Sequence, residues 1–398
     1  MTRLLTLDDL KPLAAGTAVF VRVDFNVPLT DEGKVIDDTR IVEALPTLRE
    51  LIDADCRLIL GSHCGRPKGN PDPRYSLRPV ADALAEHLGQ PVAFAEDAVG
   101  ESAEKTVAGL SNGRVCLLEN LRFESGETAN EPAFAERLAG FAEAYVNDAF
   151  GTAHRAHGSV VGVAERLEHR AAGRLIEREV KALGRLLDAP ERPFAAILGG
   201  AKIGGKIDTL QNLLPRLDLL LVGGGMANTF LVAQGHDLGD SLVENERVEM
   251  AGSILQDAKD RGVEVRLPVD LVVTDDLNQP TTVTSVGVDA VPGDWKAVDI
   301  GMESRRAFAG AVAQARTLFW NGPLGVFEKE PFDQGTRAVA AALAGGDAFT
   351  VIGGGETVAA ARQAGVADEL GHVSTGGGAS LEFLAGKKLP GIAALEID

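Results

Sequence analysis

The chain has 398 residues and a formal net charge of −19, with 45% apolar and 24% charged residues; this length predicts two or three domains, and the acidic excess argues against binding of nucleic acid or of an anionic membrane. Three cysteines without regular spacing predict no disulfide framework, the first residues hold too short an apolar stretch for a signal peptide, and no apolar run is long enough to span a membrane. We therefore expect a cytoplasmic protein in which local basic clusters capture any phosphate-bearing ligand.

Short apolar runs alternate with segments of helical period along the whole chain, a pattern typical of α/β units with mainly parallel sheets. The first half contains apolar runs at residues 17–28, 56–67, 115–123 and 143–151. Ser76–His87 has helical period, and a longer helix is expected over Leu175–Leu187, where the breakers of DAPERP follow. The second half contains apolar runs at residues 193–202, 217–225, 263–276, 317–323 and 348–355. A helix is also expected over Ser304–Ala315, and we place the junction between two domains, 1–172 and 173–378, at the Leu175–Leu187 helix.

In the first half, basic side chains lie at the ends of the apolar runs or in the loops beyond them. They are Arg22, Arg40, His63, Arg66, Arg122 and Arg155. Ligands of open α/β sheets bind outside the carboxyl ends of the strands, and arginine makes planar, bidentate contacts with carboxylate and phosphate. Any one of these residues alone is more often part of a surface salt bridge. Together they predict a site for a small, multiply charged anion.

In the second half, glycine takes these positions. The chain has 46 glycines, and four clusters follow apolar runs: Gly199-Gly200, Gly223–Gly225, Gly353–Gly355 and Gly376–Gly378. A glycine turn that opens a helix directs free N–H groups at a phosphate, although a single such turn could equally serve tight packing of strand on helix. No cluster fits G-x-G-x-x-G, so a dinucleotide-binding oxidoreductase is not supported.

The segment Gly200–Lys206 satisfies G-x-x-x-x-G-K, but Ile207 stands where a P-loop has serine or threonine. The usual magnesium ligand of a P-loop is therefore missing. Lys202 and Lys206 are four residues apart and would share one face of a helix. We predict a phosphate site here that is not a P-loop; the alternative is a pair of solvated lysines at the start of a surface helix.

The sequence favours magnesium over a transition metal. His154 and His157 are three residues apart, but no further ligands follow at the spacing of a structural zinc site. Magnesium held mainly by nucleotide phosphate and one carboxylate suits the chain better, and Glu356, directly after Gly353–Gly355, is the candidate ligand. Its charge would also favour a helix N-terminus. Motifs of serine hydrolases, zinc proteases and protein kinases are absent.

Ten segments together resemble the signature stretches of the phosphoglycerate kinase family, in the order found in that family. They are VRVDFNVP (21–28), DDTRI (37–41), SHCGRPKG (62–69), LLENLRF (117–123), NDAFGTAHRAH (147–157), GGAKIGGKI (199–207), LVGGGMANTFL (221–231), WNGPLGVFE (320–328), GGGET (353–357) and STGGGAS (374–380). The resemblance covers nearly the whole chain. It implies two doubly wound, Rossmann-like α/β domains of parallel sheets joined by a hinge helix, with residues 379–398 packed back on the first domain.

The resemblance also implies reversible phosphoryl transfer between 1,3-bisphosphoglycerate and ADP, giving 3-phosphoglycerate and ATP, in a monomer that closes about its hinge. Phosphoglycerate would be bound by the first domain, through Asp24, Phe25, Asn26, Arg40, His63, Cys64, Gly65, Arg66, Arg122 and Arg155. The nucleotide, with its Mg²⁺, would be bound by the second domain, through Lys206, Asn321, Glu328, Gly354, Gly355, Glu356 and Thr357, with Glu356 toward the metal. Transfer itself would depend on Arg40, Lys202, Gly354 and Gly377.

The chain departs from the family pattern at three positions. Cys64 replaces the usual leucine, Glu356 the usual aspartate, and Ala297 a glycine that precedes the D-I-G segment. None of these changes removes a charged group from the expected chemistry. The acceptor is a carboxylate with a pKa near ~3.5 that is ionised at neutral pH, so no general base is needed. The alternative of a non-catalytic scaffold with the same fold would require loss of Arg40, Lys202 or the glycine turns, and all are present.

Overall fold

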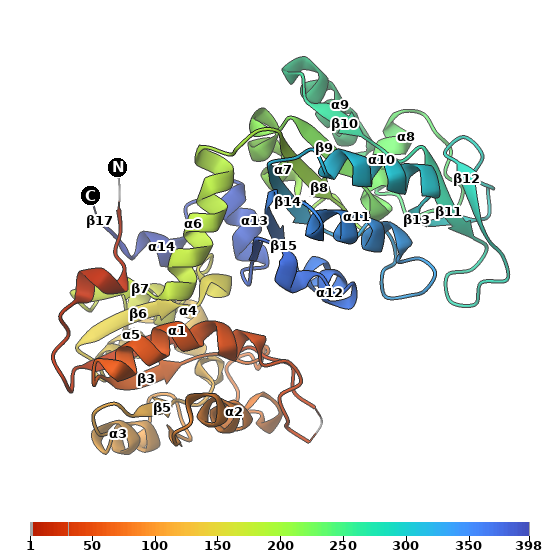
Figure 1. Cartoon of the computed structure of the whole chain (residues 1–398). Coiled ribbons are helices and arrows are strands. Elements are labelled where there is room, and N and C mark those ends of the chain that lie inside the picture. Colours follow the sequence, from red (N-terminus) through yellow and green to blue (C-terminus); the bar gives the residue numbers. More distant parts are fainter. Residues whose placement is uncertain (1–2, 31, 398) are drawn as a thin grey trace. The chain divides into compact units, whose positions relative to one another are not determined.

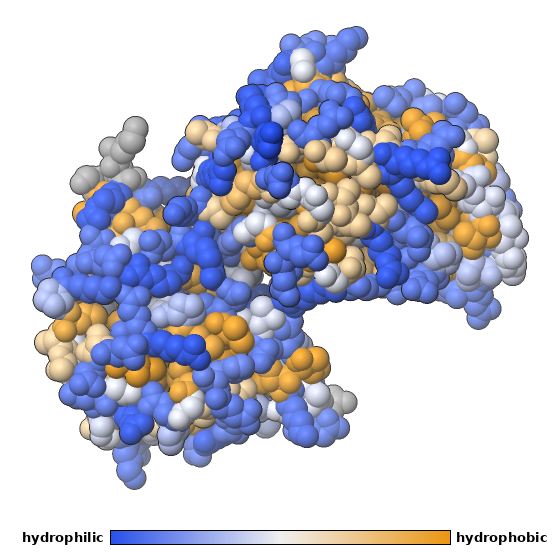
Figure 2. All heavy atoms as spheres, viewed as in Figure 1, coloured by the Kyte–Doolittle hydropathy of each residue, from blue (hydrophilic) through white to orange (hydrophobic). Residues whose placement is uncertain are grey.

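The computed structural model describes residues 3–30 and 32–397, and the chain divides into two compact units (Figure 1). Unit 1 runs to Lys181 and takes up the chain again from Lys388, and unit 2 is Ala182–Lys387. Each unit contains a parallel sheet of six strands with flanking helices, so the predicted α/β class is confirmed. The visible face of each unit is mainly hydrophilic with separate hydrophobic patches (Figure 2). Within the described residues no helix is long and apolar enough to cross a membrane.

The sheet of unit 1 is built outward from β2, in the order β4-β5-β3-β2-β6-β7, with all neighbours parallel. Its strands are β2 (Ala18–Val23), β3 (Arg57–Gly61), β4 (Val92–Phe94), β5 (Val115–Leu117), β6 (Ala144–Asp148) and β7 (His169–Ala172). Its helices are α1 (Thr39–Asp53), α2 (Arg78–Leu88), α3 (Glu101–Ala108), α4 (Ser125–Ala129) and α5 (Pro132–Ala139). Every residue of β2 and β6 is buried, as expected of strands covered on both faces. The winding of the chain reverses beside β2, which is where α/β sheets bind ligands.

Unit 2 repeats this plan around β8, in the order β10-β9-β8-β14-β15-β16. Its strands are β8 (Phe194–Leu198), β9 (Leu219–Val222), β10 (Glu264–Arg266), β14 (Thr317–Asn321), β15 (Phe349–Gly353) and β16 (His372–Val373). Its main helices are α7 (Ile207–Leu213), α8 (Gly224–Ala233), α9 (Val248–Arg261), α10 (Met302–Val312), α11 (Gln334–Ala344), α12 (Gly355–Gln363) and α13 (Gly378–Leu384). The winding reverses between β8 and β14.

A second sheet in unit 2 was not predicted. It is antiparallel, in the order β12-β11-β13, and its strands are β11 (Asp270–Thr274), β12 (Val283–Gly287) and β13 (Lys296–Ile300). The apolar run at residues 263–276 divides between two strands, β10 of the parallel sheet and β11 of the antiparallel one. Pro268 lies in the break, and proline cannot donate to a continuous ladder.

Helix α6 (Arg174–Asp188) extends the predicted helix by one residue at each end and begins in unit 1. Its first turn is fixed by side chains of that unit. The Asp148 carboxylate, at the end of β6, accepts a hydrogen bond from the Leu175 N–H at 2.9 Å, and the Thr47 hydroxyl accepts one from the Arg174 N–H at 2.8 Å. These contacts supply partners to the free N–H groups at the start of the helix.

The return of the chain to unit 1 comes later than the sequence suggests. It was expected from Ala379, but α13 belongs to unit 2. The side chains of Thr209 and Asn212, on α7, donate to backbone carbonyls of α13 at 2.8 and 2.7 Å and hold the two helices together. The segment that joins unit 1 contains α14 (Pro390–Ala393) and β17 (Glu396–Ile397), and β17 pairs with β1 (Arg3–Leu4).

Candidate active site

Basic side chains gather at the carboxyl edge of the unit 1 sheet. Arg22 is the last residue but one of β2, His63 follows β3, and Arg122 lies in the short helix η3 (Leu121–Phe123) after β5. At this edge is a cavity of about 500 Å³. Its lining consists of Arg66, Lys68, Gly69, Arg122, Ser125, Thr128, Arg155 and His157. The structure thus brings three of the predicted anion-binding arginines together around one space, which we call the first cavity.

Hydrogen bonds between loops fix the wall of the first cavity. The Gly65 N–H donates to Asn26 Oδ1 at 2.9 Å, and Arg122 donates to the Gly65 carbonyl at 2.7 Å. Gly65 has a φ of +59°, and an added Cβ would lie 2.3 Å from the Tyr75 ring, so this turn requires glycine. Two more of the predicted residues have side chains in the hydrophobic core of unit 1: Phe25 and Cys64.

The charged side chains around the first cavity favour binding of an anion. Arg40 of α1 donates to one Asp24 carboxylate oxygen, and the other Asp24 oxygen is buried without a hydrogen-bond partner, as is Nε of Arg122. Burial and the nearby charges of Arg155 and Arg22 lower the pKa of Arg122 to about 10. A bound anion would offset this repulsion among cations, so the electrostatics favour a negatively charged ligand.

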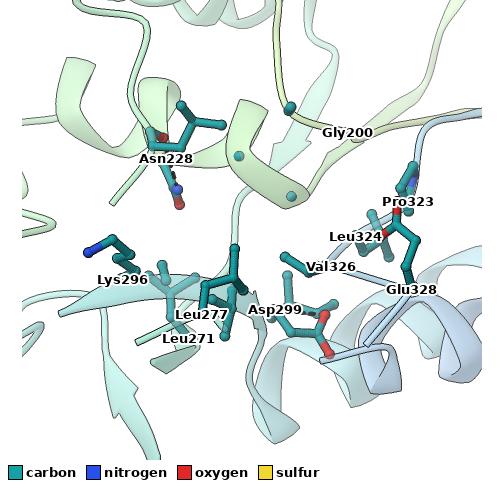
Figure 3. A pocket seen from close by; sticks show the side chains of 18 of the residues that line it. Gly200, Asn228, Leu271, Leu277, Lys296, Asp299, Pro323, Leu324, Val326 and Glu328 are labelled. Carbon is teal, nitrogen blue, oxygen red and sulfur yellow. Dashed lines mark hydrogen bonds between the residues drawn. The ribbon is translucent and has the colours of Figure 1, made fainter. Parts of the chain in front are cut away.

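The second cavity, of about 280 Å³, lies in unit 2 (Figure 3). Its walls come from the glycine turns after β8 and β9, from β13 and from the loop after β14. In Figure 3, Asn228 and Gly200 lie across the cavity from Leu277 and Asp299. The glycines and polar residues of the lining are Gly200, Gly224, Gly225, Asn228, Lys296, Asp299, Gly325, Glu328 and Glu356. The cavity therefore combines bare backbone with apolar side chains at the point where the winding of the sheet reverses.

The glycine turns of unit 2 serve two purposes. At Gly199 and Gly224 an added Cβ would lie 2.1 and 2.9 Å from neighbouring backbone atoms, so tight packing accounts for these two glycines. At Gly377, by contrast, nothing lies within 4 Å of an added Cβ. Gly377 and Gly354 have φ values of +52° and +92° and are the N-caps of α13 and α12. Exposed helix N-termini of this kind offer N–H groups to phosphate oxygens.

Lys206 is the half-buried cation of this region. Its Nζ donates to the carbonyl oxygen of Gly199 and, at 3.2 Å, to that of Asn321. Burial lowers the pKa of Lys206 to about 8, and the nearby Glu356 carboxylate opposes this shift. The lysine therefore stays mostly charged at neutral pH but loses its proton at lower pH than an ordinary lysine, and a bound phosphate would favour the charged form.

Lys202 differs from Lys206 in its surroundings. It is exposed and lies in a turn, because α7 begins only at Ile207. The expectation that both lysines share one helix face is therefore wrong. Two glycines, Gly204 and Gly205, separate the lysines, and glycine is a poor helix former.

The remaining predicted residues of unit 2 lie at the rim of the second cavity or next to it. Asn321 Nδ2 donates to the carbonyl at the end of β15 at 2.7 Å, and the Gly322 N–H donates to Thr357 Oγ1 at 2.7 Å. These two bonds connect the end of β14 to the turn after β15. Glu328 and Glu356 line the cavity and are exposed, so both carboxylates are accessible to a ligand.

Several lining residues were missed by sequence reasoning. Lys296 and Asp299 lie on β13, in the antiparallel sheet that was not predicted. Asn228 is buried on α8, and a polar residue within the apolar segment MANTFL was an available signal. Lys68 and His157 line the first cavity and lie within segments that carry the family resemblance.

Comparison with known proteins agrees with the resemblance. The family model described as phosphoglycerate kinase matches residues 7–387. The phosphoglycerate kinase of Desulforudis audaxviator is 53% identical over 382 residues, covering 96% of this chain and 97% of that protein. The chain belongs to the phosphoglycerate kinase family. A solved phosphoglycerate kinase structure from Coxiella burnetii has a TM-score of 0.89 and 41% identity over 99% of both chains, and one from Pyrococcus horikoshii has 0.82 and 34% over 98% of both.

Membership of the phosphoglycerate kinase family establishes the reaction. The chain is a phosphotransferase of glycolysis with a carboxyl group as acceptor, as predicted. This chemistry needs little proton transfer, because the acceptor carboxylate is already ionised. The demand on the protein is to hold several negative charges close together while the phosphoryl group is transferred.

Lys206 provides a direct test of the electrostatics of the second cavity. In the protein without ligands, we expect its amine to titrate near pH 8, because burial disfavours the charged form. Glu356→Gln should lower this pKa further, since it removes the carboxylate that favours the charged amine. NMR titration of ¹³C-labelled lysine, with Lys206→Met to assign the signal, measures both values. An unchanged or higher pKa in Glu356→Gln would contradict this account.

Proposed function

We propose that unit 1 binds the phosphoglycerate in the first cavity and that unit 2 binds the nucleotide in the second. The observation that carries this proposal is the contrast between their linings. The first is lined by three arginines, a lysine and a histidine, which suits a compact anion with a phosphate and a carboxylate. The second combines glycine turns with apolar side chains, which suits a flat base and its phosphates.

In the phosphoglycerate site we assign direct contact to the polar side chains, including buried ones whose atoms lack a partner, and support to the side chains that lie in the hydrophobic core. The unpartnered Asp24 oxygen is an acceptor for a substrate hydroxyl, and the unpartnered Nε of Arg122 is a donor. The residues proposed to bind by side chain are Asp24, Asn26, Arg40, His63, Arg66, Arg122 and Arg155. Phe25, Cys64 and Gly65 act through their backbone and through packing, since the side chains of the first two are in the core.

In the nucleotide site the proposed residues surround the phosphates. They are Lys206, Asn321, Glu328, Gly354, Gly355, Glu356 and Thr357. Lys206 is half-buried beside Gly200 and Gly322, where phosphate oxygens could approach both the amine and the bare backbone. Ala297 lines the same cavity, and its methyl group reduces the space available to the base or ribose.

Mg²⁺ fits this site as a partner of the nucleotide rather than as a resident of the protein. Within the described residues no three His, Cys, Asp or Glu side chains are grouped so that they could hold an ion. Glu356 supplies one accessible carboxylate, and magnesium commonly takes its other ligands from phosphate and water. When bound, the ion would neutralise phosphate charge.

For the transfer step we propose that the chain supplies positive charge from both substrates' sites. Arg40 would meet the transferring group from the phosphoglycerate side and Lys202 from the nucleotide side. The N–H groups at Gly354 and Gly377, at the starts of α12 and α13, would stabilise charge on its oxygens. The exposure of Lys202 leaves its amine free to reach a ligand.

Because the two substrates are assigned to different units, we propose that the units approach each other during the reaction, with α6 as the hinge. Closure also keeps water away from the transferring group. We further propose that the enzyme acts as a cytoplasmic monomer on phosphoglycerate and adenine nucleotides, without nucleic acid or membrane partners, in keeping with its net charge of −19.

The separation of the two sites can be tested by binding of each ligand alone. Arg66→Ala should weaken 3-phosphoglycerate binding about 10–100-fold, the scale of lost contacts to a charged group, and leave ADP binding unchanged. Lys206→Ala should weaken ADP binding and leave 3-phosphoglycerate binding unchanged. Isothermal titration calorimetry measures both, with Arg49→Ala as a control, since Arg49 is exposed on unit 1 outside the cavity lining. Loss of ADP affinity in Arg66→Ala would refute the assignment.

Lys202 should act mainly on the transition state. Lys202→Ala is expected to lower kcat by about 10²–10⁴ with little change in ADP affinity. Lys259→Ala, an exposed lysine of α9, is the matched control. Steady-state kinetics with ATP and 3-phosphoglycerate decide the matter, and near-normal turnover in Lys202→Ala would remove the residue from the proposed mechanism.

Closure should require both ligands. Each ligand alone contacts one unit, whereas the two together allow contacts that neither makes singly. Small-angle X-ray scattering should therefore give a smaller radius of gyration with 3-phosphoglycerate and Mg-nucleotide together than with either alone. A radius that is the same in all three liganded samples would rule out ligand-driven closure.

A further inference from the structure

A cation is buried in the sheet of unit 1, close enough to Arg122 of the first cavity to lower the pKa of that residue. Arg22 is fully buried within β2, although a charged group in the interior is costly unless it is paired and hydrogen-bonded. Its Nε donates to Ser159 Oγ at 2.8 Å, and one terminal nitrogen donates to the Val23 carbonyl. The other terminal nitrogen lies 3.3 Å from Nδ1 of His63. Each nitrogen of the guanidinium group therefore has a partner.

The counter-charge is a carboxylate far away in the sequence. Glu127 is fully buried, and its two oxygens accept from the Ser159 N–H at 2.8 Å and from the Ser159 hydroxyl at 2.7 Å. Since that hydroxyl has a single proton and gives it to Glu127, its oxygen must accept from Arg22. Ser159 thus bridges a buried anion and a buried cation, which fixes the position of the guanidinium group.

Arginine has no acceptor and does not lose its proton in proteins. The contact between Arg22 and His63 can therefore be a hydrogen bond only if Nδ1 of His63 carries no proton. In a neutral imidazole the proton then lies on Nε2. Among the described residues no acceptor of a hydrogen bond from Nε2 is found, so this N–H is left for a ligand.

The other charged groups around His63 also favour a neutral imidazole, with one exception. Burial, followed by the charges of Arg22, Arg122, Arg40 and Arg155, lowers the pKa of His63. The exception is Asp24, whose Oδ1 lies 3.8 Å from Nδ1 and would favour a proton there. That distance is too long for a hydrogen bond, and the other Asp24 oxygen already accepts from Arg40.

We propose that Arg22, held by Ser159 and Glu127, is a positioning residue that keeps His63 as the neutral tautomer with its proton on Nε2. His63 then offers phosphoglycerate a hydrogen-bond donor without a charge that titrates near neutral pH. This inference rests on the proposed binding of phosphoglycerate in unit 1. The arginines of the first cavity supply the permanent positive charge, and His63 supplies one hydrogen-bond donor with a fixed orientation.

The tautomer can be measured without any substrate. Long-range ¹H–¹⁵N NMR of the full chain labelled with ¹⁵N-histidine distinguishes a protonated ring nitrogen from an unprotonated one, and His63→Asn assigns the signals. We expect protonated Nε2 and unprotonated Nδ1 from about pH 8 down to about pH 6. A proton on Nδ1, or on both nitrogens, at neutral pH would overturn the proposal whatever the fate of the phosphoglycerate assignment.

Two variants of equal charge separate the hydrogen bond from simple loss of a cation. Arg22→Gln keeps an N–H donor and Arg22→Met does not, each with Glu127→Gln so that no buried carboxylate is left unpaired. Only the glutamine variant should retain the Nε2–H tautomer, and it should bind 3-phosphoglycerate about tenfold more tightly than the methionine variant, the scale of one hydrogen bond.

The pH profile of the glutamine variant gives a further readout. Without the guanidinium charge the pKa of His63 should rise. The affinity of the glutamine variant for 3-phosphoglycerate should therefore vary with pH near neutrality more than the affinity of the wild type does. Equal affinities and equal tautomers in the glutamine and methionine variants would overturn the proposal. If both variants fail to fold, the tautomer measured in the wild type decides.

Discussion

The constraint on which both cavities depend is electrostatic. A chain with a net charge of −19 must hold two ligands that each carry several negative charges. Charges farther away than roughly 8–10 Å are largely screened by physiological salt, so the overall charge matters less than the groups in direct contact with the ligand. The local supply of cations and N–H groups therefore determines where anions bind, and the acidic surface elsewhere limits binding of other polyanions.

The two units meet this constraint by different chemistry. Unit 1 concentrates guanidinium groups so closely that the pKa of Arg122 falls to about 10, a value at which the group still keeps its charge at physiological pH. The groups proposed to meet phosphate in unit 2 are the helix N-termini at Gly354 and Gly377 and a lysine, Lys206, whose pKa falls to about 8. Backbone dipoles do not titrate, but the amine does. If unit 2 binds the nucleotide, as proposed, we expect nucleotide binding to be more sensitive to alkaline pH than phosphoglycerate binding.

The sequence predicted the central parallel strands and the polar groups at their ends, because buried strands read as apolar runs and glycine and arginine follow them directly. It missed the short strands β4, β7 and β16, which lie at edges of the two parallel sheets. It did not predict β12 and β13, since β12 is mostly exposed and lacks an apolar run; with β13 it missed Lys296 and Asp299 in the second cavity. The shared helix face of Lys202 and Lys206 failed because helical spacing was assumed across two glycines. The late return of the chain depends on side-chain bonds from α7 to α13, which no local pattern reveals.

The pairing of Arg22 with Glu127 shows a further limit of local patterns. An arginine in the apolar strand AVFVRV is visible in the sequence. Its counter-charge lies on α4, which follows three further strands along the chain. The bridge between them, Ser159, comes from a third segment. Such a buried network stabilises the fold less than apolar packing of the same volume would, because desolvation offsets much of the attraction. Its physical advantage is direction, since a hydrogen-bonded guanidinium group can impose one tautomer on a neighbouring imidazole, and an apolar side chain cannot.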